Sequence, residues 1–334
     1  MAPPLPRRMP LAKPKRGWLQ FSIRTMLAVV SAACVGLSLW VVPAERQRRA
    51  VAAMEVLGGD VVYVQRDQLT REAFPVNLLR RWLPQDYFDG VTDVYLPDTE
   101  ITDAGLSDLR GLTGLQGLNL SGTRVTDGGL SSLHGLTSLQ VLWLYDTQVT
   151  DAGLAHLQGL SGLQQLSLGH TRVTDAGLVR LKGLTRLRCL FLDSPRVTDS
   201  GLVHLRGLAG LQILGLENTH VADAGLAHLG GLTGLQSLWL GGTQVTDAGL
   251  AHLQGLTSLQ QLSLNHTRVT DAGLIHLKGL TGLQWLSLDG TQVTDAGLGH
   301  LRGLPHLHTV FLWHTEVTEA GRAQLKKSLP RCQM

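Results

Sequence analysis

A string close to Val-Thr-Asp-Ala-Gly-Leu recurs along most of this chain and limits what the chain can fold into. It begins at residues 101, 125, 149, 173, 197, 221, 245, 269, 293 and 317, so the interval between successive copies is constant and contains no insertion. Copies of one fixed length that follow each other without a break pack each on its neighbours in the same way. The sequence therefore predicts a solenoid of about ten coils.

The copy over residues 115–138 shows what each coil contains. Leu118 and Leu120 flank Asn119, which is the alternation of a short strand with both leucines on one side. Three more leucines follow between 130 and 136 at a spacing of three, as in a helical turn. The pattern predicts an α/β solenoid with one strand and one short helix in each coil.

The aspartate and one glycine of each copy have expected structural roles. The aspartate precedes the helical turn, where a carboxylate can accept hydrogen bonds from free N–H groups of that helix. A glycine follows the turn, as Gly135 does before Leu136, and is expected to end the helix in a left-handed conformation. We interpret the aspartates as helix caps rather than as catalytic acids or calcium ligands. They are Asp103, Asp127, Asp151, Asp175, Asp199, Asp223, Asp247, Asp271 and Asp295.

The pattern LxxLxLxxTxVTDAGL resembles the leucine-rich repeat, and its second half is most similar to the cysteine-containing subclass. The resemblance covers about residues 91–330 and implies an α/β horseshoe of about ten coils, with a parallel sheet on its concave side and short helices on its convex side. Threonine stands where that subclass has Cys or Asn, and its hydroxyl is expected to bond to the loop backbone of the next coil. Pro195 replaces this threonine in one copy, so we expect an irregular strand exit there. With its basic start and the residues FSIRT at 21–25, the chain resembles bacterial membrane-tethered leucine-rich repeat proteins.

The N-terminal segment predicts a membrane anchor. Residues 1–24 are basic, and residues 25–42 form an uncharged apolar run that as a helix would extend about 27 Å, close to the thickness of a bilayer core. Trp18 and Trp40 lie near its two ends as interfacial anchors. Six positive charges precede the run and three follow closely, which favours a cytoplasmic N-terminus and exported repeats. We expect a single-pass protein with a transmembrane helix or signal anchor.

Two other interpretations of this segment stay open. Val42-Pro43-Ala44 offers a small-residue cleavage site, which would make the body a secreted or periplasmic protein. Residues 31–34 loosely resemble a lipoprotein processing site at Cys34, although the usual aliphatic residue three positions before the cysteine is missing.

Both ends of the solenoid need covering, because an open end exposes leucines. Residues 45–90 are expected to form the N-terminal cap, with helices over 49–57 and around 78–83 and a strand over 61–64. Residues 91–322 hold the repeats. Residues 323–334 form the C-terminal cap, with a closing helix over 320–329 that Pro330 ends.

Charge and motifs argue against several functions. The first 50 residues carry nine Lys and Arg against one acid, so the remainder holds 20 basic and 25 acidic residues, a net charge of −5. Such a body lacks the basic surface that nucleic acid requires. The sequence contains no nucleophile elbow, phosphate loop or zinc-protease helix, and its three cysteines are scattered. We expect no enzymatic activity, no cofactor and no nucleic-acid partner.

The histidines predict no metal site. Six of them share one helix position along the convex side, where adjacent helices lie about 8–10 Å apart, too far for neighbouring imidazoles to share a metal. These six are His156, His204, His228, His252, His276 and His300. A looser group, His306, His308 and His314, lies near the end of the repeats and is also interpreted as surface.

All eight aromatic residues after position 90 fall on or beside the predicted strands, on the side away from the leucines. Tyr95, Trp143, Phe191, Trp239 and Phe311 lie between the two strand leucines, and Tyr145, Trp285 and Trp313 lie just before or after them. The first four recur in every second copy, with Asn119, Ser167 and Gly215 at the same position in the copies between them. Strands about 4.8 Å apart would then place an aromatic ring every ~9.6 Å along the concave sheet.

We interpret these eight residues as a binding surface for a protein or glycan, because exposed apolar patches commonly mark contacts. Acidic residues lie near the aromatics and arginines lie on their flank, a mixture that suits such partners, whereas the net charge of −5 argues against a nucleic-acid strand. The acids are Asp146, Asp193, Glu217 and Asp289, and the arginines are Arg124, Arg172, Arg196 and Arg268. The alternative is a structural envelope spacer, in which the aromatic residues only shelter the exposed sheet.

Overall fold

The computed structural model describes residues 31, 42–65 and 89–334, and the chain divides into two compact units, Met1–Pro43 and Ala44–Met334. The predicted membrane span at 25–42 therefore lies outside the described residues, apart from Ser31 and Val42. No helix within the described ranges combines the length and the apolar character that crossing a bilayer requires.

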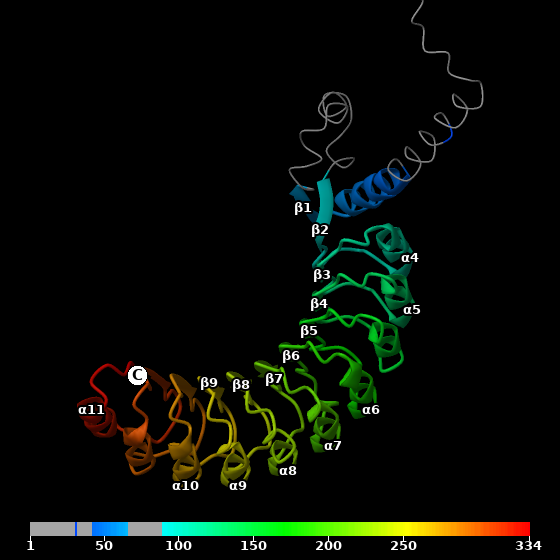
Figure 1. Cartoon of the computed structure of the whole chain (residues 1–334). Coiled ribbons are helices and arrows are strands. Elements are labelled where there is room, and N and C mark those ends of the chain that lie inside the picture. Colours follow the sequence, from blue (N-terminus) through cyan, green and yellow to red (C-terminus); the bar gives the residue numbers. More distant parts are fainter. Residues whose placement is uncertain (1–30, 32–41, 66–88) are drawn as a thin grey trace, which may run out of the picture. The chain divides into compact units, whose positions relative to one another are not determined.

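The second unit is an α/β solenoid with an eleven-stranded sheet in chain order over the described residues (Figure 1). β1 (Asp60–Gln65) pairs antiparallel with β2 (Asp89–Tyr95), and each later strand pairs parallel with the one before it. The later strands are β3 (Gly117–Asn119), β4 (Val141–Trp143), β5 (Gln165–Ser167), β6 (Cys189–Phe191), β7 (Ile213–Gly215), β8 (Ser237–Trp239), β9 (Gln261–Ser263), β10 (Trp285–Ser287) and β11 (Thr309–Phe311). The predicted solenoid with a parallel sheet is confirmed.

The helical side of each coil is short, because a single repeat must make a whole turn of the solenoid. Most coils have one α-helical turn followed by a 3-10 turn, and two coils have a 3-10 helix alone. The α-helices are α4 (Asp103–Leu106), α5 (Asp127–Leu130), α6 (Asp175–Leu178), α7 (Asp199–Leu202), α8 (Asp223–Leu226), α9 (Asp247–Leu250), α10 (Asp271–Leu274) and α11 (Glu319–Ser328). The 3-10 helices are η2 (Ser107–Gly111), η3 (Ser131–Leu133), η4 (Gly153–Leu157), η5 (Val179–Gly183), η6 (Val203–Leu205), η7 (Ala251–Leu253), η8 (Ile275–Gly279) and η9 (Gly297–Gly303).

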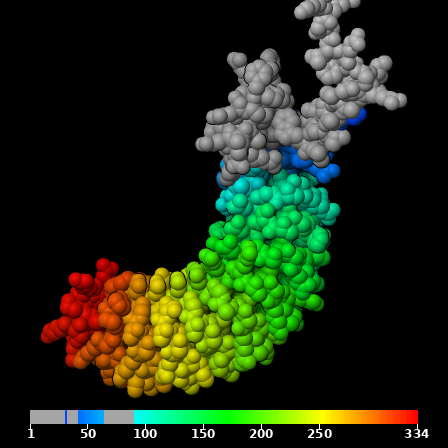
Figure 2. All heavy atoms as spheres, in the orientation of Figure 1, coloured from blue at the N-terminus to red at the C-terminus, as the bar shows by residue number. Residues whose placement is uncertain are grey.

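Strands line the inner side of the curved array and helices its outer side (Figure 1). Between them runs a continuous aliphatic core to which every coil contributes leucines at the same positions. In Figure 2 the coils stack against each other along the whole array. Each coil therefore buries its leucines mainly against the coils before and after it.

Elements outside the repeats cover both ends of the repeat array, so the leucines of the first and last coils are not exposed. A helix over residues 42–56 packs Ala50 and Met54 into the core, and β1 then covers β2. At the other end Pro330 follows α11, and Gln333 pairs beside β11. Its N–H donates to the His308 carbonyl and its own carbonyl accepts from Val310 N–H, both at 2.8 Å. The helix expected around 78–83 lies outside the described residues.

The aspartates join neighbouring coils instead of capping their own helices, so the predicted cap role is wrong. Asp103 is the first residue of α4, and its carboxylate accepts from the backbone N–H of Thr126 at 2.8 Å and from the Thr126 hydroxyl at 2.5 Å. The cap of α5 is Thr126, whose hydroxyl oxygen accepts from Gly128 N–H at 3.3 Å. A carboxylate at the first helical position finds these donors because the next coil's helix begins directly beside it.

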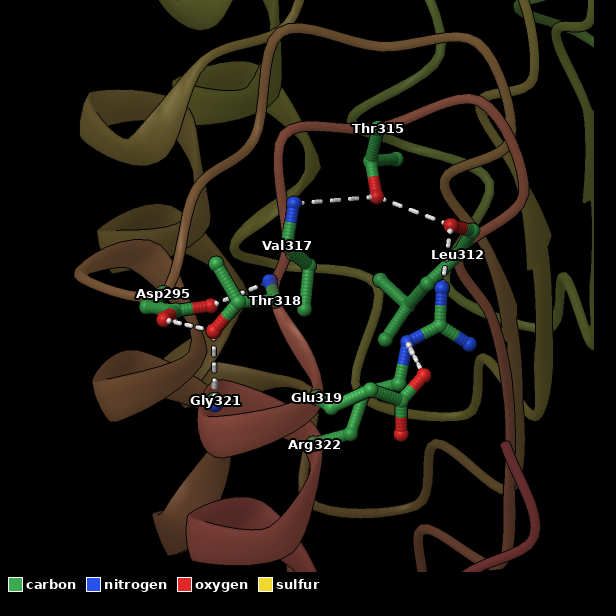
Figure 3. A network of polar contacts seen from close by, with 8 residues as sticks. All are labelled: Asp295, Leu312, Thr315, Val317, Thr318, Glu319, Gly321 and Arg322. Carbon is green, nitrogen blue, oxygen red and sulfur yellow. Dashed lines mark hydrogen bonds and ion pairs between the residues drawn. The ribbon is translucent and has the colours of Figure 1, made fainter.

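This arrangement, here called the Asp–Thr ladder, recurs between successive coils up to α11. Figure 3 shows its last junction, where Asp295 accepts from both the N–H and the hydroxyl of Thr318. The hydroxyl of Thr318 in turn accepts from Gly321 N–H at 3.2 Å. These hydrogen bonds from Thr318 lower the pKa of Asp295, because they favour its charged form.

The glycine of each Asp-Ala-Gly-Leu copy makes room for the ladder. A Cβ atom on Gly249 would lie 2.4 Å from Oδ1 of Asp223, and one on Gly273 would lie 2.3 Å from Oδ1 of Asp247. The other glycine, expected to end each helix in a left-handed conformation, does so only at Gly135, where φ is +92°. The glycine of Asp-Ala-Gly-Leu is therefore required because it leaves space beside a carboxylate. The glycine after the helix is not required for a left-handed turn in most coils.

The threonine before the ladder bonds within its own coil, which corrects the expected bond to the next coil. The hydroxyl of Thr123 donates to the Leu120 carbonyl at 2.6 Å, and its equivalents do the same. The residue before this threonine has a left-handed φ in the other coils, but Ser194, before Pro195, does not. Proline disfavours that conformation in the preceding residue. Within the described residues Ser194 also lacks the N–H bond to the next coil that His170 and Asn218 make, so the predicted irregularity is confirmed.

We expect Gly249→Ala to destabilise the fold by about 1–3 kcal/mol, because the added methyl group must displace the Asp223 carboxylate from Thr246. Gly207→Ala is the matched control, since a Cβ atom there would meet no atom within 4 Å. Urea unfolding of both variants measures the difference. Equal stabilities would contradict the role assigned to the recurrent glycine.

We expect Ala222→Thr to stabilise the fold by about 1 kcal/mol. Ala222 replaces the ladder threonine in the coil of α8, where only its backbone N–H bonds Asp199, at 2.7 Å, and α8 has no side-chain cap. A threonine would supply both missing bonds. Ala224→Thr, two residues later on the exposed side of α8, should give no gain in the same urea titration; a gain there equal to that of Ala222→Thr would refute the explanation.

Candidate functional site

The aromatic residues lie on the concave side, outside the leucine core. Residues on either side of the central strand leucine point away from the core, so Trp143 is 39% exposed while the preceding Leu142 is fully buried. Trp313 is the most exposed aromatic, at 62%, and Phe191, Trp239, Trp285 and Phe311 are partly buried. Their position agrees with the sequence analysis, and their binding role stays a prediction.

The rings are not evenly spaced, although their recurrence in every second copy suggested that they would be. Phe191 and Trp239 lie on strands separated by β7, yet their ring centroids are only 5.5 Å apart. They meet over Gly215, where a Cβ atom would lie 2.7 Å from Cδ1 of Phe191. Trp285 and Phe311, on neighbouring strands, form a second pair at 5.5 Å.

A shallow pocket of about 160 Å³ separates Tyr95 from Trp143. Its floor contains Asn119 of β3, and Asp93 and Gln165 also line it. This pocket combines two aromatic walls with groups that can donate and accept hydrogen bonds, which is typical of a recess for one side chain of a partner.

The centre of the concave face carries two acidic residues, Asp193 and Glu217, close to each other. Oδ1 of Asp193 accepts from the backbone N–H of Glu217 at 3.1 Å. Burial raises the pKa of both carboxyl groups, and the charge of Asp193 raises that of Glu217 further. The bond from Glu217 and the proximity of His170 oppose the increase at Asp193 without cancelling it.

Tyr145 and His170 extend this acidic pair into a larger group, with ring centroids 4.9 Å apart. A Cβ atom on Gly169 would lie 3.0 Å from Cδ2 of Tyr145 and 3.3 Å from Oδ2 of Asp193, so both side chains lean over this glycine. A Cβ atom on Gly215 would lie 3.2 Å from Oδ1 of Asp193, which places the Phe191–Trp239 pair beside it. The central cluster is the set Tyr145, His170, Phe191, Asp193, Glu217 and Trp239.

Neither Asp193 nor Glu217 forms an ion pair in the described part of the chain, although His170 lies near Asp193. The ion pairs there join Arg124 to Glu100 at 3.1 Å and Arg322 to Glu319 at 3.9 Å. Neither involves the concave centre. Two partly buried carboxylates next to each other cost stability at neutral pH, and such a cost is typical of functional positions.

Sequence reasoning placed Asp193 and Glu217 near the aromatics but missed His170 and the pocket residues Asn119 and Gln165. Their positions within the repeat could have identified them. Asn119 and Gln165 occupy positions that are aromatic in other copies, and His170 lies one position after the one that Tyr145 occupies in its copy. Of the other predicted polar residues near the face, Asp289 accepts from Trp313 N–H at 2.7 Å. Over the described residues, no group of three or more His, Cys, Asp or Glu is arranged to hold a metal ion.

Comparison with known proteins identifies the repeat. Residues 255–277, which run from the end of one coil through the strand and helix of the next, match the family model described as Leucine Rich repeat. The repeat is a leucine-rich repeat. The other copies have the same period and the same strand order, so the assignment holds for them as well. No curated protein matches the chain.

Solved leucine-rich repeat structures resemble this one. Internalin C2 of Listeria monocytogenes is 28% identical over 64% of this chain and 84% of its own, with a TM-score of 0.49. An internalin, InlF, from the same organism is 21% identical over 79% and 91%, with a TM-score of 0.43. The ectodomain of the Arabidopsis thaliana receptor kinase GASSHO1/SCHENGEN3, solved with Casparian strip integrity factor 2, is 21% identical over 77% and 32%, with a TM-score of 0.48.

Because the folded state raises the pKa of Asp193 and Glu217, it binds protons more readily than the unfolded chain. Their contribution to stability is therefore full below the ordinary carboxyl pKa and is lost as pH rises through the raised values. We expect Glu217→Gln to be more stable than the native chain at about pH 7 and equal to it at about pH 4. Urea unfolding at the two pH values measures this, with the exposed Glu55→Gln as control; a native chain as stable as Glu217→Gln at the higher pH would contradict it.

Proposed function

We propose that this chain is a non-catalytic, membrane-anchored binding module that recognises a protein partner through the concave face of its leucine-rich repeats. Solenoids of this kind present extended concave surfaces for binding. The observation that carries the proposal is the central cluster, which sets two unpaired carboxylates beside the Phe191–Trp239 ring pair.

The chemistry of the central cluster favours a partner with a basic side chain. A guanidinium or ammonium group placed between Asp193 and Glu217 would relieve their repulsion, and an aromatic face beside it stabilises a cation further. The pocket between Tyr95 and Trp143 would take a second side chain of the same partner. A glycan could stack on the rings but would leave the acidic pair without a counter-charge, so a protein is the better partner.

Membrane anchoring belongs to the same proposal. The uncharged run over residues 25–42 and the excess of positive charge before it support a single span with the N-terminus in the cytoplasm and the repeats exported. Such an anchor would hold the concave face where envelope or external proteins reach it. Secretion after cleavage near Ala44 is the alternative.

We expect the double substitution Trp143→Ala and Trp239→Ala to reduce capture of a partner from an envelope extract by roughly 30-fold or more, because central aromatic residues dominate the free energy of most interfaces. The control Val203→Ala and Ile275→Ala removes two exposed apolar side chains from the convex 3-10 helices. Leu142→Ala should instead cost about 2–5 kcal/mol of stability, because its side chain is fully buried.

Capture on beads and thermal unfolding of these variants of the full chain separate the alternatives. A folded double-tryptophan variant with undiminished capture would refute the concave binding face and favour the structural spacer. Unfolding of that variant would show that the rings serve the core.

We expect a reporter enzyme that is active only after export to be active when fused after Met334. The reason is the asymmetry of six against three positive charges around residues 25–42. A reporter that functions only in the cytoplasm, fused at the same point, is the control. Activity of that reporter alone would overturn the proposed topology.

A further inference from the structure

The described residues contain a second polar recess, far along the chain from the central cluster. A pocket of about 320 Å³ lies where the cap helix over residues 42–56 meets η2 of the first coil. Arg46 and Arg49 line it from the cap helix, and Arg110 lines it from η2, with Ser107 and Asp108 at its side. Pockets of this volume are large enough for one small ligand group.

Packing brings the three arginines to this pocket. Arg46 and Arg49 are three residues apart on one helix, so they share a face. A Cβ atom on Gly111 would lie 3.2 Å from Cβ of Arg46, which shows how closely η2 approaches the cap helix. The contact between the cap and the first coil therefore brings the three arginines to the lining of one pocket.

No ion pair among the described residues neutralises the positive charge of this pocket. Across residues 42–65 and 89–334, none of the three arginines takes part in the ion pairs, which join Arg124 to Glu100 and Arg322 to Glu319. Asp108 offsets one positive charge of the pocket lining, which leaves a formal charge of +2. Planar guanidinium groups with free N–H donors match the oxygen geometry of a phosphate group.

We propose that this pocket binds the phosphate of an anionic lipid headgroup. The inference rests on the proposed membrane anchoring, because three residues separate Val42 from Arg46, so that their Cα atoms lie at most about 14 Å apart. A headgroup layer extends roughly 5–8 Å beyond the hydrocarbon core. The chain therefore limits how far Arg46 can lie from the lipid phosphates, and the pocket would fix the first coil at the bilayer surface.

Hydrogen exchange of the full chain in lipid nanodiscs tests this proposal. Anionic phosphatidylglycerol should slow exchange of residues 44–56 and 103–111 relative to neutral phosphatidylcholine. The triple variant Arg46→Gln, Arg49→Gln, Arg110→Gln should need at least five times as much anionic lipid for half of this protection. The reason is that each arginine near an anionic surface strengthens binding by about that factor. Arg180→Gln, Lys182→Gln, Arg302→Gln removes three charges from η5 and η9, far along the chain from the pocket, and should behave as the native chain.

Each of the other outcomes overturns one part of the proposal: the pocket, the lipid as its ligand, or the membrane anchor. Equal protection in both triple variants would refute the pocket. Equal protection by inorganic phosphate added to neutral nanodiscs would show a free phosphate site instead of a lipid site. Failure of the chain to enter nanodiscs would refute the anchor. A phosphate titration of thermal unfolding then tests the pocket alone, and an unchanged midpoint in the native chain refutes it.

Discussion

A carboxylate shared between coils is the interaction on which this solenoid depends. Each ladder aspartate accepts the N–H and, in all but one junction, the hydroxyl of the next coil's cap residue, and that threonine hydroxyl caps the helix of its own coil. One short motif therefore starts each helix, fixes its distance from the preceding coil and requires glycine beside the carboxylate. Each of these bonds links two neighbouring coils. The same geometry therefore extends along the array from α4 to α11 without contacts between coils that are not neighbours.

This scaffold leaves the concave positions free to vary. The leucine in the middle of each strand is fixed by the core, and the ladder fixes the convex side. The residues on either side of that leucine lie outside the leucine core, and they range from Gly117 and Ser167 to Trp143 and Trp239. Function is therefore expected where the sequence departs from its repeat. The central cluster is such a departure, since the partly buried carboxylates of Asp193 and Glu217 cost stability without serving the core.

The fold could be predicted from the sequence because a constant repeat length and the alternation of leucines determine strand, helix and stacking direction together. The same pattern placed Trp143 and Tyr95 on the outer side of their strands. It could not show that Asp103 bonds Thr126, because a periodic sequence does not distinguish a bond within a coil from one to the next. The contact of Phe191 with Trp239 depends on the missing side chain of Gly215 and on the lean of both rings, which the period does not encode. The hydrogen bond from Glu217 N–H to Asp193 lies just before Pro195, where the regular turn is disrupted, and the period does not encode it either.

Photocrosslinking from the two sides of the same coils tests the central claim, that recognition belongs to the concave face while the ladder only builds it. A photoreactive amino acid at Asn119 or Ser167 would lie among the aromatic residues, and one at His134 or Arg180 would lie on the convex side of the same coils. We expect a crosslinked partner protein from Asn119 and Ser167 and none from His134 and Arg180. Crosslinks from the convex positions alone, or equally from both sides, would contradict it.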